Sequence, residues 1–181
     1  MTLKDLTISY QNKIKLLEVS RKENALIIAG DYTALIINRV QNQGESSDGS
    51  KFKKYSDNPL PLFFFGDGNS KTKADRFKKD VKKKKTEPSY ENFRQYLGLP
   101  TDKRTLTMTG DMFKSIRPEI LEHNDFVTIV EIKARDKFNQ DKVNWNSGEL
   151  GISIISANQN EKQMVENANK KRVETILNQY Q

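Results

Sequence analysis

One segment constrains the fold more than any other: residues 23–43, with the sequence ENALIIAGDYTALIINRVQNQ. Its apolar and small side chains recur every three to four residues, which is the period of an α-helix. Gly44 follows as a stop signal. More than half of the helix circumference is apolar, so we expect it to be covered on two sides, by a sheet and another helix or by a neighbouring subunit. The main stripe consists of Leu26, Gly30, Thr33, Ile37 and Val40.

The rest of the chain offers little apolar material to cover this helix. Hydrophobic residues make up 35% of the 181 residues, whereas globular domains usually contain about 45–50%. The length fits one domain. We therefore predict a single domain, residues 1–181, whose core is thin and which draws part of its stability from partners.

Shorter patterns predict the other elements. Apolar spacing indicates a helix over residues 4–22, with Leu6, Tyr10, Ile14 and Leu17 on one side, and a C-terminal helix over 161–179, with Met164, Ala168, Ile176 and Tyr180 on one side. Ser89 caps a short helix over 89–97, and Thr109 caps another that Pro118 limits. Strands are expected at 105–108 and 126–132, the latter paired with 151–155. Together these elements predict an α+β fold with long N-terminal helices, a small antiparallel sheet, a C-terminal helix and a long Lys-rich loop.

The positive charge of the chain is concentrated in one segment. Residues 51–85 hold 12 Lys and Arg against 4 acids, while the remainder holds 19 basic and 20 acidic residues, for a net charge of +7. Within this segment, residues 66–88 contain Phe77 and Val81 as the only large apolar residues, so we expect an exposed basic arm, either a loop or a short solvated helix. Its cations are predicted to contact DNA or a neighbouring protein: Lys71, Lys73, Arg76, Lys78, Lys79, Lys82, Lys83, Lys84 and Lys85.

The segment PLPLFFF, residues 59–65, places three phenylalanines in a row. Its two prolines restrict it to an edge strand or a packed extended loop. Side chains alternate along a strand, so one hypothesis buries Phe63 and Phe65 and covers Phe64 with the basic arm. The alternative hypothesis is that Phe63, Phe64 and Phe65 form a subunit interface, since exposed apolar patches usually mark interfaces.

Several classes of function find no support in the residues. The chain has no Cys and one His, His123, which are too few for a zinc site or a catalytic triad, so we read His123 as a loop residue. The glycines of GDGNS lack a P-loop signature. The N-terminus lacks a signal peptide, and no run is long enough for a membrane span. We therefore expect a soluble protein without a cofactor, a metal ion or enzymatic activity.

Two alternative functions remain open. Glu131 and Lys133 form a Glu-x-Lys pattern on the predicted strand 126–132, with Asp125 before it, and this resembles the magnesium site of PD-(D/E)xK nucleases. That family places its Asp on an earlier strand, however, and an exposed Glu/Lys pair is the competing interpretation. The lysine run KKDVKKKK would instead suit a non-specific DNA-binding accessory protein, whose affinity would depend on salt.

Two motifs resemble a known family. The first is a helix followed by a Gly-rich loop and then Phe52, Tyr55 and Ser56. The second is TLTMTGDMFKSI, which matches a recurrent Leu-Thr-x-Thr-Gly-x-Met-x-x-Ser-Ile pattern at Leu106, Thr107, Thr109, Gly110, Met112, Ser115 and Ile116. Over residues 23–135 the chain is similar to the tail-completion, or virion-morphogenesis, proteins of tailed bacteriophages. The family's later Asn-Glu-x-x-Arg-like segment is met loosely by Asn160, Glu161 and Lys162.

The resemblance implies a structural role in the virion. Proteins of this family form a ring in the head–tail connector, or neck, that links the portal to the tail and lines the DNA channel. We would then expect a homo-oligomeric ring, for which a dodecamer is one candidate, that assembles in the host cytoplasm. Its partners would be the portal or an adjacent connector ring, tail proteins and packaged DNA. The composition, rich in Lys, Asn and Ile, is typical of a phage of an AT-rich host, such as a crAss-like phage.

Overall fold

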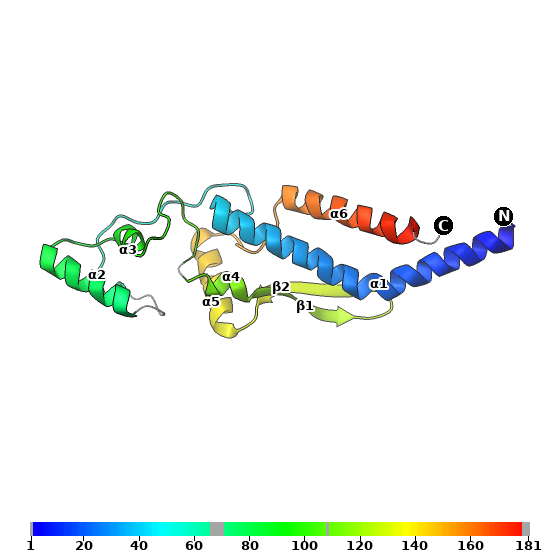
Figure 1. The fold of residues 1–181 in the computed structure, drawn as a ribbon, viewed down its shortest axis with the longest axis horizontal. Helices are drawn as coiled ribbons and strands as arrows, with labels where there is room; N and C mark the ends of the chain where they lie inside the picture. Colours follow the sequence, from blue (N-terminus) through cyan, green and yellow to red (C-terminus); the bar gives the residue numbers. More distant parts are fainter. Residues whose placement is uncertain (1, 66–70, 108, 179–181) are drawn as a thin grey trace.

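The computed structural model describes residues 2–65, 71–107 and 109–178. They form a mixed α+β fold that is mostly helical, as predicted, with an elongated outline (Figure 1). The elements are α1 (Leu3–Asn38), a π-helical turn (Arg39–Gln43), a 3₁₀ turn (Leu62–Phe64), α2 (Lys71–Lys84), α3 (Tyr90–Tyr96), α4 (Asp111–Ser115), β1 (Ile116–His123), β2 (Thr128–Ala134), α5 (Lys137–Leu150) and α6 (Gln159–Asn178).

α1 is one continuous helix rather than the two that we predicted. It begins with a capping box, in which the Thr2 hydroxyl accepts from the Asp5 backbone N–H and the Asp5 carboxylate accepts from Thr2. No helix-breaking residue separates the two predicted segments, so the hydrogen-bond ladder continues through Lys22 and Glu23. The helix ends through the π-helical turn at Gly44, whose φ of 67° is left-handed.

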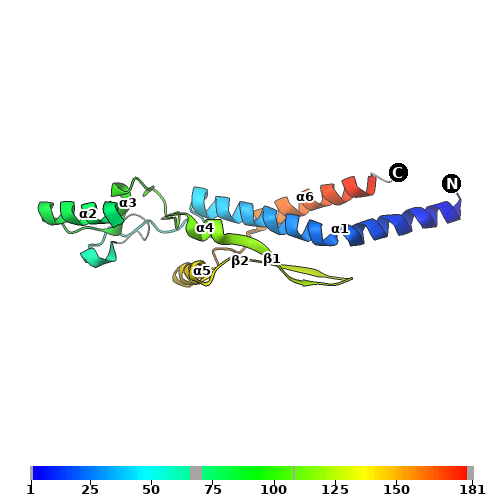
Figure 2. The same ribbon diagram turned by 60° about the horizontal axis from the view of Figure 1, so that its bottom comes forward.

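The C-terminal half of α1 is covered on two sides, as its apolar circumference predicts. It packs against α6 on one side and against the β1–β2 hairpin on the other (Figures 1 and 2). Ala29, Thr33 and Ile36 are the buried side chains of this half. Of the two covers that we expected, a sheet with another helix or a neighbouring subunit, the structure has the sheet and the helix.

α6 follows the prediction with small differences. Val165 is its buried apolar side chain, whereas Met164 points to solvent and Ala168 is half-buried. Tyr180, which we assigned to the same apolar side, lies outside the described residues. Among the helices that the structure describes, none is both long enough and apolar enough to cross a membrane.

The sheet is a two-stranded antiparallel hairpin whose pairing differs from our prediction. β2 covers the predicted strand at 126–132, but its partner is β1, which directly precedes it. Residues 151–155 form no strand; they follow the left-handed Gly151 at the end of α5, and Ile154 enters the core from a loop. Thr105–Thr107 are not in a strand either, and Met108 lies outside the described residues. A hairpin with a short turn closes the smallest loop, which favours β1 as the partner.

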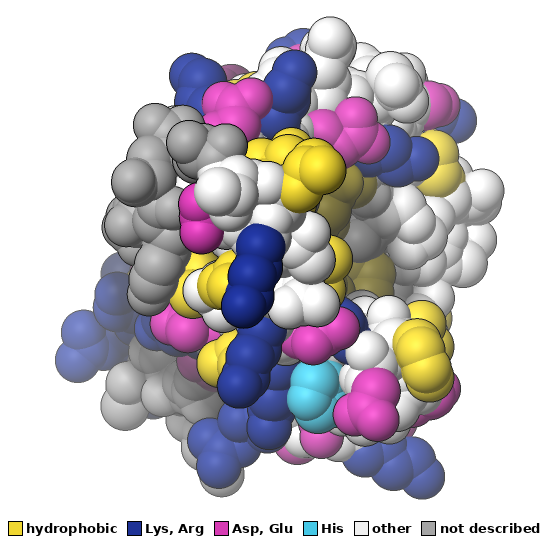
Figure 3. All heavy atoms as spheres, turned by 90° about the vertical axis from the view of Figure 1, so that its right-hand side faces the viewer, with side chains coloured by type: hydrophobic (Ala, Val, Ile, Leu, Met, Phe, Trp, Pro, Cys, Tyr) yellow, Lys and Arg dark blue, Asp and Glu magenta, His cyan; other side chains and the backbone are white. Residues whose placement is uncertain are grey.

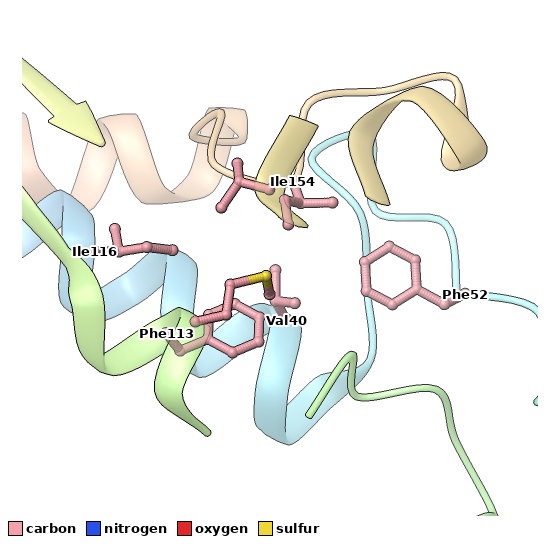
Figure 4. Close-up of a cluster of buried hydrophobic side chains, with 7 residues drawn as sticks. Val40, Phe52, Phe113, Ile116 and Ile154 are labelled. Atoms are coloured by element: carbon pink, nitrogen blue, oxygen red, sulfur yellow. The ribbon is translucent and has the colours of Figure 1, made fainter. Parts of the chain in front are cut away.

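The main core lies where α1, α4, β1 and α5 meet. Its side chains come from segments far apart in the sequence, as the close-up in Figure 4 shows, and Val40 is fully buried among them. The cluster consists of Val40, Phe52, Met112, Phe113, Ile116, Val143 and Ile154.

A second, smaller hydrophobic cluster holds α2 and α3 together. Phe65 and Phe93 are fully buried at its centre, with ring centroids 5.4 Å apart. Ala74, Phe77 and Val81 contribute one buried face of α2. The basic arm is therefore the helical alternative of our prediction, and its few apolar residues suffice to dock it because they share one face at helical spacing. This cluster lies at the end of the molecule opposite the N-terminus (Figure 1).

Candidate functional site

The cations of the basic arm line the solvent side of α2. The side chains of Lys73, Arg76 and Lys79 are exposed, and so are those at 82–85, whereas Lys78 is half-buried. The side chain of Lys71 lies outside the described part of the chain. We define the exposed cations as the α2 basic face: Lys73, Arg76, Lys79, Lys82, Lys83, Lys84 and Lys85.

The three phenylalanines are divided by a 3₁₀ turn. Phe65 is buried as predicted, but Phe63 is 77% exposed and Phe64 is 57% exposed, so the hypothesis that buries Phe63 and covers Phe64 is wrong. The reason is that residues 62–64 form a turn, in which strand alternation does not apply. Phe63 and Phe64 instead stack on each other, with ring centroids 4.5 Å apart. They present an exposed aromatic pair beside the second cluster.

A groove of about 720 Å³ lies between the two hydrophobic clusters. Its walls come from the segment 53–56, from α3, from the segment 104–107 and from α5. Trp145 in the lining is 65% exposed, and Phe64 also lines the groove. Four cationic side chains line the groove against one carboxylate: Lys53, Lys54, Arg94 and Arg104 against Glu149. We call this the basic–aromatic groove.

Arg94 is the most deeply buried cation of the groove. Its guanidinium stacks over the Tyr55 ring, 4.0 Å from the centroid, and donates to the carbonyls of Pro100 at 3.2 Å and Thr107 at 2.6 Å. Its remaining nitrogen, Nη2, and Nε of Arg104 have no hydrogen-bond partner among the described residues. Burial raises the pKa of the neighbouring Tyr90 hydroxyl, and the charge of Arg94 opposes that rise. Arg94 and Arg104 therefore place positive charge in the wall of the groove.

The tip of the β1–β2 hairpin, Leu121–Val127, is the second prominent surface. The Asn124 side-chain oxygen accepts from the backbone N–H groups of Phe126 and Val127 at 2.9 and 2.8 Å, which fixes the turn. The Phe126 side chain is 88% exposed at this turn. In the end-on view of Figure 3, the single histidine (cyan) lies between basic (dark blue) and acidic (magenta) side chains. Arg21 of α1 donates to the backbone carbonyls of Asn124 and Asp125, so the tip is anchored to the body.

The residues of the nuclease hypothesis form an ion-pair cluster on the hairpin. Lys133 Nζ lies 3.1 Å from a carboxylate oxygen of Glu119 and 3.1 Å from one of Glu131. Hydrogen bonds to Glu119 and then to Glu131 raise the pKa of Lys133, so its ammonium form is favoured. Asp125 lies in the turn, at the other end of the strand from Lys133. Within the described ranges, no group of three acidic or histidine side chains is placed to hold a metal ion.

His123 is an exposed residue near the hairpin tip. Its Nδ1 lies 2.8 Å from the Thr128 hydroxyl, across the strand pair. His123 is therefore the last residue of β1 rather than a loop residue, and its exposure is as we predicted.

The structure brings the two family-like motifs together in the main core. Phe52 of the first motif and Met112 and Ile116 of the second belong to the same buried cluster. The backbone of Gly110 is left-handed, with a φ of 82°, where α4 begins. Thr107 accepts from Arg94 through its carbonyl and from Gln41 through its hydroxyl. These motif residues therefore pack in the core or set the direction of the backbone.

Sequence reasoning missed the groove, because its residues are spread from position 53 to position 149. A partial signal was present in the pairing of aromatic and basic residues in the segment KFKKYS. Comparison of the chain with protein-family models, with curated proteins and with solved structures finds no match.

Proposed function

We propose that this protein is a non-catalytic structural subunit that assembles into a homo-oligomeric ring, and that the ring is part of a phage head–tail connector. The observation that carries the proposal is the N-terminal half of α1. The N-terminal end of α1 projects past the β1–β2 hairpin (Figure 1). Most helical stability in proteins comes from the packing of an apolar face, so this end of the helix gains stability by packing against another subunit.

The side chains of this projecting helix suit such packing. Leu3 is 85% exposed, and Leu6, Tyr10 and Ile14 continue the exposed apolar stripe at spacings of three and four residues. Stripes of this kind on one helix face pack against neighbouring helices. The occupant that we propose is a second copy of the chain, because a closed ring covers the same stripe on every subunit.

The α2 basic face supports the placement of the ring in a connector. Seven exposed cations, six on the solvent-exposed surface of α2 and Lys85 directly after it, offer non-specific contacts to phosphates, without exposed aromatic side chains between them for stacking on bases. In a connector that lines the DNA channel, this face would contact packaged DNA, or it would dock on an adjacent ring protein. The family resemblance of the two core motifs supplies the link to the connector, with the portal and tail proteins as further partners.

Assembly is tested first in solution. Native mass spectrometry of the purified chain should show a ring with a defined copy number. Introducing charge into the stripe with Tyr10→Glu and Ile14→Glu should yield monomers. The matched control, Gln11→Glu with Asn12→Glu, adds the same charge to exposed positions of the same helix and should leave the ring intact. A wild-type chain that stays monomeric at high concentration would contradict the proposal.

The place in the virion is tested on particles. Quantitative mass spectrometry of purified virus particles should find the chain at a ring-like ratio to the portal. Absence from particles would refute the connector role. The nuclease alternative has a separate test, because Glu131→Ala would abolish magnesium-dependent DNA cleavage by a nuclease and should leave ring assembly unchanged.

A further inference from the structure

We infer that the hairpin tip of one copy, Leu121–Val127, docks in the basic–aromatic groove of the next copy. The inference rests on the proposed ring and names the surfaces that close it. Within one chain the tip lies at the end of the β1–β2 hairpin that is far from α5, and α5 forms one wall of the groove (Figures 1 and 2). The tip therefore meets a groove only on another copy.

Charge complementarity favours this pairing. The tip sequence LEHNDFV contains two carboxylates, Glu122 and Asp125, and no Lys or Arg. Arg21 of α1 donates to the backbone carbonyls of the tip, so its guanidinium is directed at the backbone. The groove carries four cations against one carboxylate. Complementary potentials of this kind steer association and set the register of an interface.

Shape and apolar surface also match. Phe126 and Leu121 are exposed at the tip, and Leu121 lies at an irregularity in the β1–β2 register, between Ile120 and Glu122. The groove presents exposed Trp145 and Phe64. Aromatic side chains that insert into a pocket are the usual anchors of protein interfaces. The Phe126 side chain would then insert into the groove between the two clusters.

The proposed contact joins two different surfaces of the chain, so it can repeat head to tail from one copy to the next. Head-to-tail contacts generate rings when the rotation between neighbours closes, and this is the arrangement that the proposed ring requires.

A charge exchange tests the contact. A tip variant, Glu122→Lys with Asp125→Lys, and a groove variant, Lys53→Glu with Lys54→Glu, should each lose assembly while retaining the wild-type circular dichroism. Mixed in equal amounts, the two variants should assemble again, because each supplies the surface that matches the other. Phe126→Ala should weaken association by roughly tenfold or more, and Phe138→Ala, an exposed phenylalanine on α5, should leave it unchanged. Failure of the mixture to assemble would overturn the inference.

Cross-linking gives an independent result, since the chain contains no Cys. A Glu122→Cys variant mixed with a Lys53→Cys variant should form a dimer with a short bismaleimide, whereas a mixture of Glu122→Cys with Lys162→Cys, on exposed α6, should not. Cross-linking of Glu122→Cys to itself would show tip against tip and overturn the inference. A wild-type ring without the mixed cross-link would refute the docking alone, whereas a monomeric wild-type chain would refute the ring as well.

Discussion

Arg39 and Glu161 form a buried ion pair that joins the end of α1 to the start of α6, with Nε of Arg39 2.8 Å from the Glu161 carboxylate. The other guanidinium nitrogens of Arg39 donate to the carbonyls of Glu45 at 2.9 Å and Ser156 at 2.7 Å. The Glu161 carboxylate also accepts from the backbone N–H of Asn158, and the Asn158 side-chain oxygen accepts from the backbone N–H of Glu161. One guanidinium thus holds three separate segments at the edge of the main core.

We predict that Arg39→Ala destabilises the fold by about 3–5 kcal/mol, because it leaves a buried carboxylate without its partner. Arg39→Lys should recover only part of the loss, since an ammonium cannot reproduce the planar fork. The control is Asp31→Ala, which removes the partly exposed pair with Arg172 between the same two helices and should cost about 0–1 kcal/mol. Chemical denaturation measures both values, and equal losses would contradict the assignment.

A second prediction concerns the two glycines in and just after α1. Gly44→Ala should destabilise by about 1–2 kcal/mol, because a residue with a Cβ is strained in the left-handed region. That Cβ would also lie 3.2 Å from the Arg104 carbonyl oxygen. Gly30→Ala should stabilise by about 0.5–1 kcal/mol, because Gly30 is helical and its Cβ would meet nothing within 4 Å. The thermal unfolding midpoints of the two variants should therefore shift in opposite directions from that of the wild-type chain.

The third prediction separates the two hydrophobic clusters. Phe93→Ala should cost the α2–α3 region about 3–5 kcal/mol, since Phe93 is fully buried and contacts the rings of Phe65 and Phe77. Hydrogen exchange should accelerate in α2 and remain slow in the C-terminal half of α1, which packs elsewhere. Phe63→Ala, which removes an exposed ring, is the control. It should change neither the stability of the α2–α3 region nor the hydrogen-exchange rates of α2. Uniform acceleration over the whole chain would show that the clusters unfold as one unit.

The fourth prediction is a titration. Hydrogen bonds from the Ser46 hydroxyl and then from Ser50 lower the pKa of Asp48 from 3.8 to about 2. Because the folded-state pKa is depressed, the stabilising contribution is present above the ordinary value and is lost as the pH falls toward 2. Ser50→Ala removes one hydroxyl donor and should raise the pKa of Asp48 toward 3.8. Carboxyl chemical shifts measured by NMR from pH 1.5 to 6 follow this change, and an unshifted midpoint in the variant would contradict it.

The sequence by itself determined part of the local structure of this protein. The helical period of residues 23–43 and the cap at Ser89 depend on neighbours a few positions apart, and the structure has a helix at each. For the lysines at 71–85 the sequence left a loop or a helix open, and the structure has the helix α2 in place of the predicted long loop. The α+β class follows from the same local signals. Such signals are encoded in adjacent residues, so they can be predicted without knowing what packs against them.

The tertiary structure decided which segments meet. It made α1 one helix, chose β1 rather than residues 151–155 as the partner of β2, and exposed Phe63 while burying Phe65. It also joined Arg39 to Glu161 across 122 positions and assembled the groove from four distant segments. These outcomes depend on loop closure and on competition for a limited apolar surface. Neither effect depends on adjacent residues alone, and both are decided only when the whole chain packs.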